Sequence, residues 1–307
     1  MTDQSVSATG ATAGRIDTDY TVGQDNIRTT IGPFGLDIHN PVFVISGLTI
    51  VAFVVFSLAL QEQAGELFGW LRSTLTSTFD WFFLLAGNVF VLLCLFLIVS
   101  PYGSVRLGGK DAVPDYSYPG WFAMLFAAGM GIGLMFYGVS EPLTHYTTAV
   151  AEDAGTAESW APLAGAVGSP EEARRLGMAA TIFHWGLHPW AIYAVVALAL
   201  ALFTYNKGLP LTVRSVFYPI FGERVWGWTG HIIDTLAVFA TLFGLATSLG
   251  FGAEQANAGL EFLFGIPVND VSKVLLITAI TAVALVSVIA GLDAGVKRLS
   301  EINMVLA

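Results

Sequence analysis

The chain has 307 residues, of which 55% are hydrophobic and only 12% are charged, and its mean hydropathy is +0.69. A soluble domain carries about 25% charged residues, so this composition excludes an ordinary soluble protein and indicates several membrane spans. The single cysteine, Cys94, excludes a disulfide framework and a cysteine metal cluster. The formal net charge of −10 suits loops bathed in high salt, and a merely acidic protein is the alternative.

Residues 1–30 are polar and lack an apolar core, so we expect no cleavable signal peptide. Their Ser, Thr, Gly and Asp content predicts a disordered tail over residues 1–34.

Apolar runs along the rest of the chain predict six complete spans, each long enough for the roughly 20 residues that a bilayer helix needs. These spans cover residues 41–61, 79–99, 118–139, 174–204, 230–264 and 271–291. The run at 174–204 exceeds one crossing and predicts a tilted or extended helix. Segment 208–224 is too short and too charged to span, and it predicts an interfacial helix and turn. A further apolar run stops at Ala307, which suggests a fragment of a longer protein.

The distribution of Lys and Arg predicts a cytoplasmic N-terminus in a multi-pass protein of the cell membrane. With this orientation, the outer segments hold only Arg72, Arg174, Arg175 and Lys273 of the 13 basic residues. The 140–170 loop has neither Lys nor Arg and is acidic, as expected for an external loop.

The third span contains GMGIGLMFYGVSEPLTHY at residues 129–146, a glycine row inside an apolar run. Gly129, Gly131, Gly133 and Gly138 allow the backbone to open and another group to approach closely. Irregular backbone at membrane depth persists only where it is buried in protein or lines a cavity. We therefore predict a substrate or ion site here.

The fourth span contains FHWGLHPWAIY at residues 183–193. Pro189 cannot donate a helical hydrogen bond and predicts a kink, around which Trp185, Trp190 and Tyr193 can form an aromatic box. Such a box binds a quaternary ammonium through its ring faces; packing or interfacial aromatics are the alternative. His184 and His188 have the spacing of a metal pair, but no third ligand is evident, which favours packing histidines.

The fifth span contains TLFGLATSLGFGAEQANAG at residues 241–259. Thr241 and Ser248 lie seven apart, hence on one helix face, and their hydroxyls suit sodium. Bonding of these hydroxyls to their own helix is the alternative. Glu254 is an intramembrane acid and is therefore a functional candidate. The sequence contains no GxSxG, P-loop, HExxH or CxxC pattern, so we expect no enzyme.

Together with IDTLAVFATLFG at 233–244 and INMVLA at 302–307, these motifs resemble the betaine/carnitine/choline transporter family over roughly residues 35–307. The resemblance implies an all-α, polytopic membrane protein with a LeuT-like inverted-repeat fold. Residues 1–34 would be the cytoplasmic tail, 35–110 two leading helices, and 111–307 most of the first repeat. The second repeat is missing from this chain.

The resemblance also implies residue roles. Trp185, Trp190 and Tyr193 match the aromatic substrate cage, which the second repeat completes. The opened backbone at Gly129, Met130, Gly131 and Gly133 would meet the substrate carboxylate and the ion. Ala127 and Met130 match one sodium site, and Thr241 and Ser248 fall at the other. Leu245 departs from the hydroxyl residue that sodium-coupled relatives often have there, which weakens the case for two ions.

Gly133 indicates the coupling ion, because the intact GMGIG row is typical of sodium-coupled betaine carriers in this family, whereas proton-coupled choline carriers tend to have Asp there. The resemblance thus implies sodium-coupled import of glycine betaine, or a related trimethylammonium osmolyte, by alternating access, serving osmoprotection. The alternatives are a choline or carnitine carrier or exchanger, an osmosensor without transport, an ion channel, or a scaffold. The expected partners are the substrate, sodium and the lipid bilayer; members are often homotrimers. We expect no cofactor besides sodium and no nucleic acid.

Overall fold

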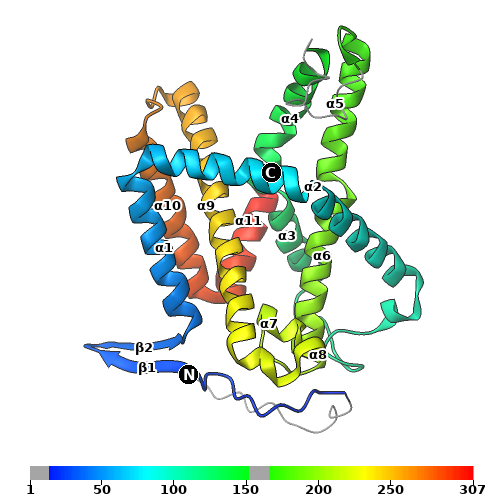
Figure 1. The fold of residues 1–307 in the computed structure, drawn as a ribbon, viewed down its shortest axis with the longest axis vertical. Coiled ribbons are helices and arrows are strands. Elements are labelled where there is room, and N and C mark those ends of the chain that lie inside the picture. The colour runs from blue at the N-terminus through cyan, green and yellow to red at the C-terminus, as the bar shows by residue number, and fades with distance from the viewer. Residues whose placement is uncertain (1–13, 152–165, 307) are drawn as a thin grey trace. The chain divides into compact units, whose positions relative to one another are not determined.

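The computed structural model describes residues 14–151 and 166–306. Helices dominate these residues, and a small antiparallel hairpin precedes them (Figure 1). The strands are β1 (Asn26–Ile31) and β2 (Phe34–His39), and the α-helices are α1 (Val42–Ala59), α2 (Gln61–Val99), α3 (Tyr118–Gly129), α4 (Ile132–Val150), α5 (Pro170–Trp185), α6 (Leu187–Ala201), α7 (Val213–Val216), α8 (Tyr218–Phe221), α9 (Trp228–Phe264), α10 (Asp270–Gly291) and α11 (Lys297–Leu306). Short 3-10 helices cover Pro101–Ser104 and Gly222–Trp226, and π-helical turns at Leu202–Asn206 and Leu292–Val296 extend α6 and join α10 to α11.

Within the described residues, five helices are long and apolar enough to cross a membrane, or six if the bent pair α3 and α4 counts as one span. Each of the six predicted spans has a counterpart among them, which confirms a polytopic, mainly helical membrane protein. Large apolar side chains on these helices are exposed, as lipid-facing side chains are; Val99 and Phe262 are examples. Two boundaries differ. Helix α2 begins at Gln61 and fills the predicted gap before residue 79. Residues 61–78 contain no proline, so nothing there stops the helix. Helix α4 continues to Val150, past the predicted end of the third span at residue 139, so the start of the predicted 140–170 loop is helical.

The hairpin corrects part of the predicted disordered tail. Residues 26–34 of that tail form β1 and the turn at Gly32, whose φ of +60° suits glycine. Asn26 pairs with His39 and Ile31 with Phe34, so the register leaves only Gly32 and Pro33 in the turn. Residues 1–13 lie outside the described part of the chain.

The described helices fall into two compact units, and each is described by itself. The first comprises Met1–Ala112 and Gly186–Thr241. Its α2 and α6 pack where Gly87 leaves room for His188, with only 3.5 Å between a Cβ built at Gly87 and the His188 ring. A small core forms where Tyr20 stacks on Trp226, with ring centroids 4.4 Å apart and Leu209 and Val225 buried beside them.

Arg214 is the polar centre of this first unit, with only 2% of its side chain exposed. Its Nε lies 3.1 Å from Oδ2 of Asp234, and Oδ1 of the same carboxylate accepts from the Arg214 backbone N–H at 3.0 Å. Its Nη2 donates to the Tyr20 hydroxyl at 2.9 Å and lies 3.1 Å from Nε2 of His39. The guanidinium also lies over the rings of Tyr20 and Trp226. This arginine therefore holds residues 15–39, here called the N-terminal segment, against the first unit.

The second unit comprises Val113–Trp185 and Leu242–Ala307. Its α4 and α5 run side by side (Figure 1) and meet through small residues, with Ala149, Ala173 and Ala180 buried between them. Gly177 is required for this approach, because a Cβ there would lie 3.0 Å from the backbone N of Tyr146. Small residues at a helix interface bring two backbones close, so side chains from α4 and α5 can converge.

Candidate functional site

The apolar span that begins at Tyr118 is interrupted in its middle. Helix α3 ends at Gly129 and α4 starts at Ile132, and the two helices are bent by 46°. Met130 has ψ of 52° and Gly131 is extended, so neither continues the helix. The interruption predicted from the glycine row is thereby confirmed.

This interruption leaves polar backbone groups available in an apolar run. The last carbonyls of a helix have no intrahelical donors, and Ala127 lies in the last turn of α3. The first N–H groups of the next helix point at whatever lies before it and favour negative charge. The Met130 N–H donates to the Phe126 carbonyl at 2.7 Å, so the helical hydrogen bonds of α3 continue as far as Met130. A cation and a carboxylate can therefore both find ligands at this break.

Gly133, in the first turn of α4, faces the indole of Trp185 at the end of α5. A Cβ built at Gly133 would lie 3.4 Å from Cη2 of Trp185, an ordinary contact distance, so the indole lies close to the backbone at the break. Nε1 of Trp185 is buried and has no acceptor among the described residues. An unpaired buried N–H costs about 1–3 kcal/mol, so this donor is suited to a ligand acceptor.

Trp185 is the end of a row of aromatic rings within the second unit. Its ring centroid lies 6.3 Å from that of Tyr137, which lies 5.8 Å from Phe251 on α9; Phe251 stacks on Phe136 at 5.6 Å. Sequence reasoning missed Tyr137 as a partner of Trp185, and Phe251 as a partner of Tyr137. The available signal was that Tyr137 lies four residues after Gly133, hence on the same helix face.

Trp190 and Tyr193 form a separate pair on α6, in the first unit. Their ring centroids are 6.0 Å apart, and the side chains are 49% and 68% exposed. The chain leaves the helix at Gly186 (ψ −137°) rather than at Pro189, which occupies the first turn of α6, where its missing N–H costs nothing. The predicted kink is thus present three residues earlier. The predicted box of three aromatic residues stays a prediction.

Some of the hydroxyls on α9 bond to the backbone of their own helix, which was the alternative to a sodium site. Thr241 Oγ1 donates to the carbonyl of Ala237 at 2.8 Å, and Thr247 Oγ1 donates to that of Phe243 at 2.9 Å. Ser248 is exposed on α9. A hydroxyl that donates one bond keeps its lone pairs, so these bonds leave Thr241 able to bind a cation.

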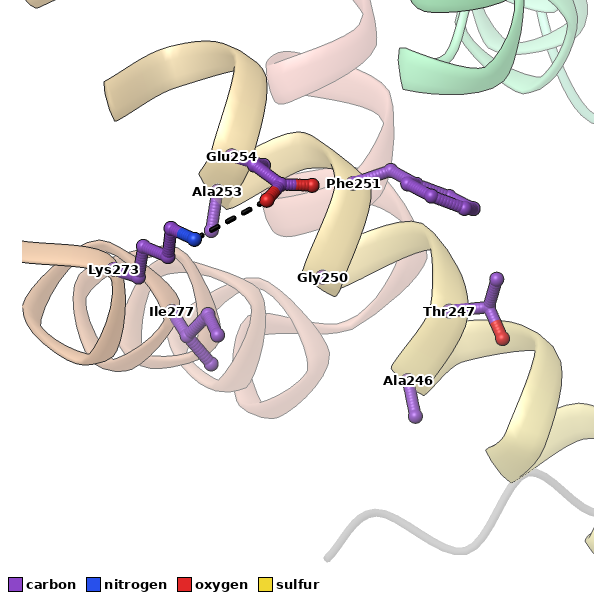
Figure 2. A pocket seen from close by; sticks show the side chains of 8 residues that line it. All are labelled: Ala246, Thr247, Gly250, Phe251, Ala253, Glu254, Lys273 and Ile277. Carbon is purple, nitrogen blue, oxygen red and sulfur yellow. Dashed lines mark hydrogen bonds and ion pairs between the residues drawn. The ribbon is translucent and has the colours of Figure 1, made fainter. Parts of the chain in front are cut away.

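An open pocket of about 380 Å³ lies between α9 and α10 in the second unit. Figure 2 shows the side chains that line it. The pocket is lined by Ala246, Thr247, Gly250, Phe251, Ala253, Glu254, Lys273 and Ile277. Glu254 Oε1 pairs with Lys273 Nζ at 3.2 Å, and both side chains are partly exposed. An exposed pair of this kind contributes little to stability. The ring of Phe251 points away from Lys273, toward the opposite side of α9. Phe251 therefore both lines the pocket and contacts the rings of Phe136 and Tyr137.

The histidines at 184 and 188 have different partners. Nδ1 of His184 lies 3.2 Å from Oε2 of Glu141 on α4, within the second unit. Nε2 of His188 lies 3.3 Å from Oδ1 of Asn88 on α2, within the first unit. The i, i+4 pairing considered from the sequence is replaced by these two contacts.

Comparison with known proteins agrees with these features. A family model described as betaine/carnitine/choline family transporter matches residues 41–307. A glycine betaine/proline/choline transporter of Vibrio parahaemolyticus is 65% identical over 295 residues, which is 95% of this chain and 53% of that protein. Glycine betaine transporter 1 of the same species is 56% identical over 94% of this chain and 53% of its own length. A glycine betaine transporter of Bacillus subtilis is 47% identical over 77% of this chain and 44% of its own length.

The chain therefore spans about half the length of the curated relatives that it matches. The family model covers most of the chain, including both the interrupted helix and the segment that carries Trp185, Trp190 and Tyr193. The chain belongs to the betaine/carnitine/choline transporter family.

Proposed function

We propose that this protein is a sodium-coupled secondary transporter that imports glycine betaine, or a related trimethylammonium compound, across the cell membrane. The observation that carries the proposal is the interrupted helix at Met130–Gly131, which faces Trp185 through Gly133. Three relatives named above are glycine betaine transporters, which supports this substrate class. A cytoplasmic N-terminus and a LeuT-like inverted-repeat fold, operating by alternating access, belong to the same proposal.

The substrate would be held by its two chemically different ends. A trimethylammonium group has no N–H, so only aromatic ring faces stabilise its charge. Trp185 and Tyr137 offer such faces beside the break, and Trp190 and Tyr193 offer a second pair on α6. The carboxylate would accept hydrogen bonds from the first N–H groups of α4 and from Nε1 of Trp185.

One sodium ion would bind to oxygen atoms at the α3 end of the same break. The carbonyls of Ala127 and Met130 are hard ligands in or next to the last turn of α3. The hydroxyls of Thr241 and Ser248 would supply the second ion site. The Thr241 hydroxyl already donates to Ala237, so its lone pairs are oriented and available.

The test is uptake of labelled glycine betaine by proteoliposomes that contain the full-length protein. Flux should require an inward sodium gradient, and it should stop when potassium replaces sodium at fixed pH. Equal flux in both salts would overturn sodium coupling and favour a proton-coupled carrier or an exchanger. Binding without flux would favour an osmosensor. Competition by unlabelled choline and carnitine would rank the substrates.

The aromatic contribution is tested by Trp185→Leu, Trp190→Leu and Tyr193→Leu. Each should weaken betaine affinity by about 1–2 kcal/mol, roughly 5- to 30-fold, the size of a desolvated cation–π contact. Trp70→Leu, at an exposed tryptophan on α2, is the matched control and should not change the affinity. Unchanged affinity in all three variants would overturn the assignment.

A further inference from the structure

Two histidines and a glutamate converge between α4 and α5 in the second unit. Glu141 and His145 are four residues apart on α4, hence on one face of that helix. His184, in the last turn of α5, reaches the same carboxylate from the neighbouring helix. Its Nδ1 lies 3.2 Å from Oε2 of Glu141, and Nε2 of His145 lies 3.5 Å from that same oxygen. One ligand atom from each of the three side chains lies within 4.8 Å of the others.

Two of these three separations match the edges of a metal coordination polyhedron. Zinc binds imidazole nitrogen and carboxylate oxygen at about 2.0–2.2 Å, so adjacent ligand atoms of a tetrahedral site lie about 3.3–3.5 Å apart. The two measured edges, 3.2 and 3.5 Å, lie at these values without any movement of the helices. Imidazole is also the ligand type that late first-row metal ions prefer.

The three side chains differ in exposure, and the cluster is accessible to water beside the most exposed of them, His184. The Glu141 and His145 side chains are only 16% and 14% exposed, whereas that of His184 is 43% exposed. An ion bound here would have three protein ligands and a fourth position open to water. Two histidines with one glutamate and an open position is a ligand set that zinc accepts in proteins.

We propose that Glu141, His145 and His184 form a binding site for a divalent transition-metal ion, with Zn²⁺ as the best match. The close approach of the helices makes the site, because Gly177 and the buried alanines bring α5 against α4 one to two turns away. The rival explanation of the same distances is a hydrogen-bonded network in which one carboxylate serves two imidazoles.

A metal at this position would tie α4 to α5 beside the proposed substrate site. Trp185 directly follows His184 in the chain, and Gly133, which faces Trp185, lies on the same helix as Glu141. Zn²⁺ should therefore inhibit betaine flux by restraining this helix pair. This consequence rests on the proposed function, whereas metal binding itself does not.

The binding test uses the purified full-length protein and Co²⁺, whose visible absorption reports tetrahedral nitrogen and oxygen ligation, with Zn²⁺ as the competitor. One equivalent of ion should bind per chain. His145→Ala and His184→Ala should each weaken binding by roughly 10- to 100-fold or more, because loss of even an outer partner of a metal ligand has that effect. His188→Ala, which removes the histidine beside Asn88, is the matched control and should retain the affinity.

Two further variants keep the test decisive if an alanine variant fails to fold. Glu141→Gln keeps the side-chain shape and should lose the ion, whereas His184→Cys should keep it, because a thiolate also binds zinc. Absence of binding to the folded protein, or binding that is equal in all variants, would overturn the metal site and leave the hydrogen-bonded network. Zinc binding by a protein that shows no betaine flux even in metal-free buffer would retain the site and remove the proposed function; flux in metal-free buffer by a protein that binds no zinc would do the reverse.

Discussion

Replacing Arg214 with methionine should release the N-terminal segment, residues 15–39, from the first unit. The Arg214 side chain donates to the Tyr20 hydroxyl, lies beside His39, and covers the Tyr20 ring at 5.1 Å. A hydrogen bond from a charged donor contributes about 1.5–3 kcal/mol and a desolvated cation–π contact about 0.5–2 kcal/mol. The two interactions share one side chain, so their free energies do not add fully. We therefore expect the variant to lose about 2–4 kcal/mol of the free energy that holds the N-terminal segment in place, which raises the equilibrium constant for its detachment roughly 30- to 1,000-fold.

The assay is hydrogen exchange of the protein in nanodiscs, followed by mass spectrometry of peptides that cover β1, β2 and Ile16. The Ile16 N–H donates to the Lys207 carbonyl at 3.0 Å, so it reports detachment directly. Arg224→Met, at an exposed arginine in the same unit, is the control and should leave exchange unchanged. Unaltered protection of the segment in folded Arg214→Met protein would refute the reasoning.

A double variant separates local release from general destabilisation. Arg214→Met alone leaves the Asp234 carboxylate, only 13% exposed, without its cation, and breaking a buried pair in this way costs roughly 3–5 kcal/mol. Asp234→Asn removes that unpaired charge and keeps an oxygen for the Arg214 backbone N–H. The double variant should therefore regain thermal stability, while the N-terminal segment still exchanges rapidly.

Two more outcomes follow from single positions. Gly133→Ala should retain betaine flux, because its Cβ would lie at an ordinary contact distance of 3.4 Å from Trp185. Gly133→Asp should abolish flux, because it would place a buried carboxylate against the indole. Equal flux in the two variants would contradict the inferred contact between position 133 and Trp185. The pKa of His39 is lowered by burial and by the Arg214 guanidinium, against a smaller opposite effect of Asp25. The neutral imidazole therefore favours attachment of the N-terminal segment. The segment should be fully attached above the ordinary His pKa of about 6.5, and its attachment should weaken as the pH falls through the lowered pKa. Hydrogen exchange of β1 and β2 between pH 7.5 and 5 measures this attachment, with His39→Gln as the control.

The spans and the interrupted helix were predictable because their signals are local. About 20 apolar residues suffice to identify a bilayer helix, whatever surrounds it. The glycine row at 129–133 marks a weak helix in the same direct way, since glycine costs about 1 kcal/mol relative to alanine at each helical position. The backbone departs from the helix at Met130 and Gly131, inside that row.

The N-terminal hairpin was not predictable from the same kind of signal. Residues 15–39 are polar and short of apolar periodicity, which by composition indicates disorder. Their order in the structure comes from partners almost 200 residues away, since Tyr20 binds Arg214 and stacks on Trp226. Contacts of that sequence separation leave no periodic trace in the segment itself, so composition misjudged it.

The histidines show why spacing arguments fail where a helix breaks. His184 and His188 share a face only if the helix runs through both, and the chain leaves it at Gly186 between them. Once that condition fails, each histidine contacts a residue of the helix packed beside its own: Glu141 on α4 for His184, and Asn88 on α2 for His188. The same break explains why Trp185 contacts Tyr137, whereas Trp190 contacts Tyr193. The other two members of the proposed metal site, Glu141 and His145, lie on α4, and the close packing of α4 and α5 at Gly177 accompanies their approach to His184.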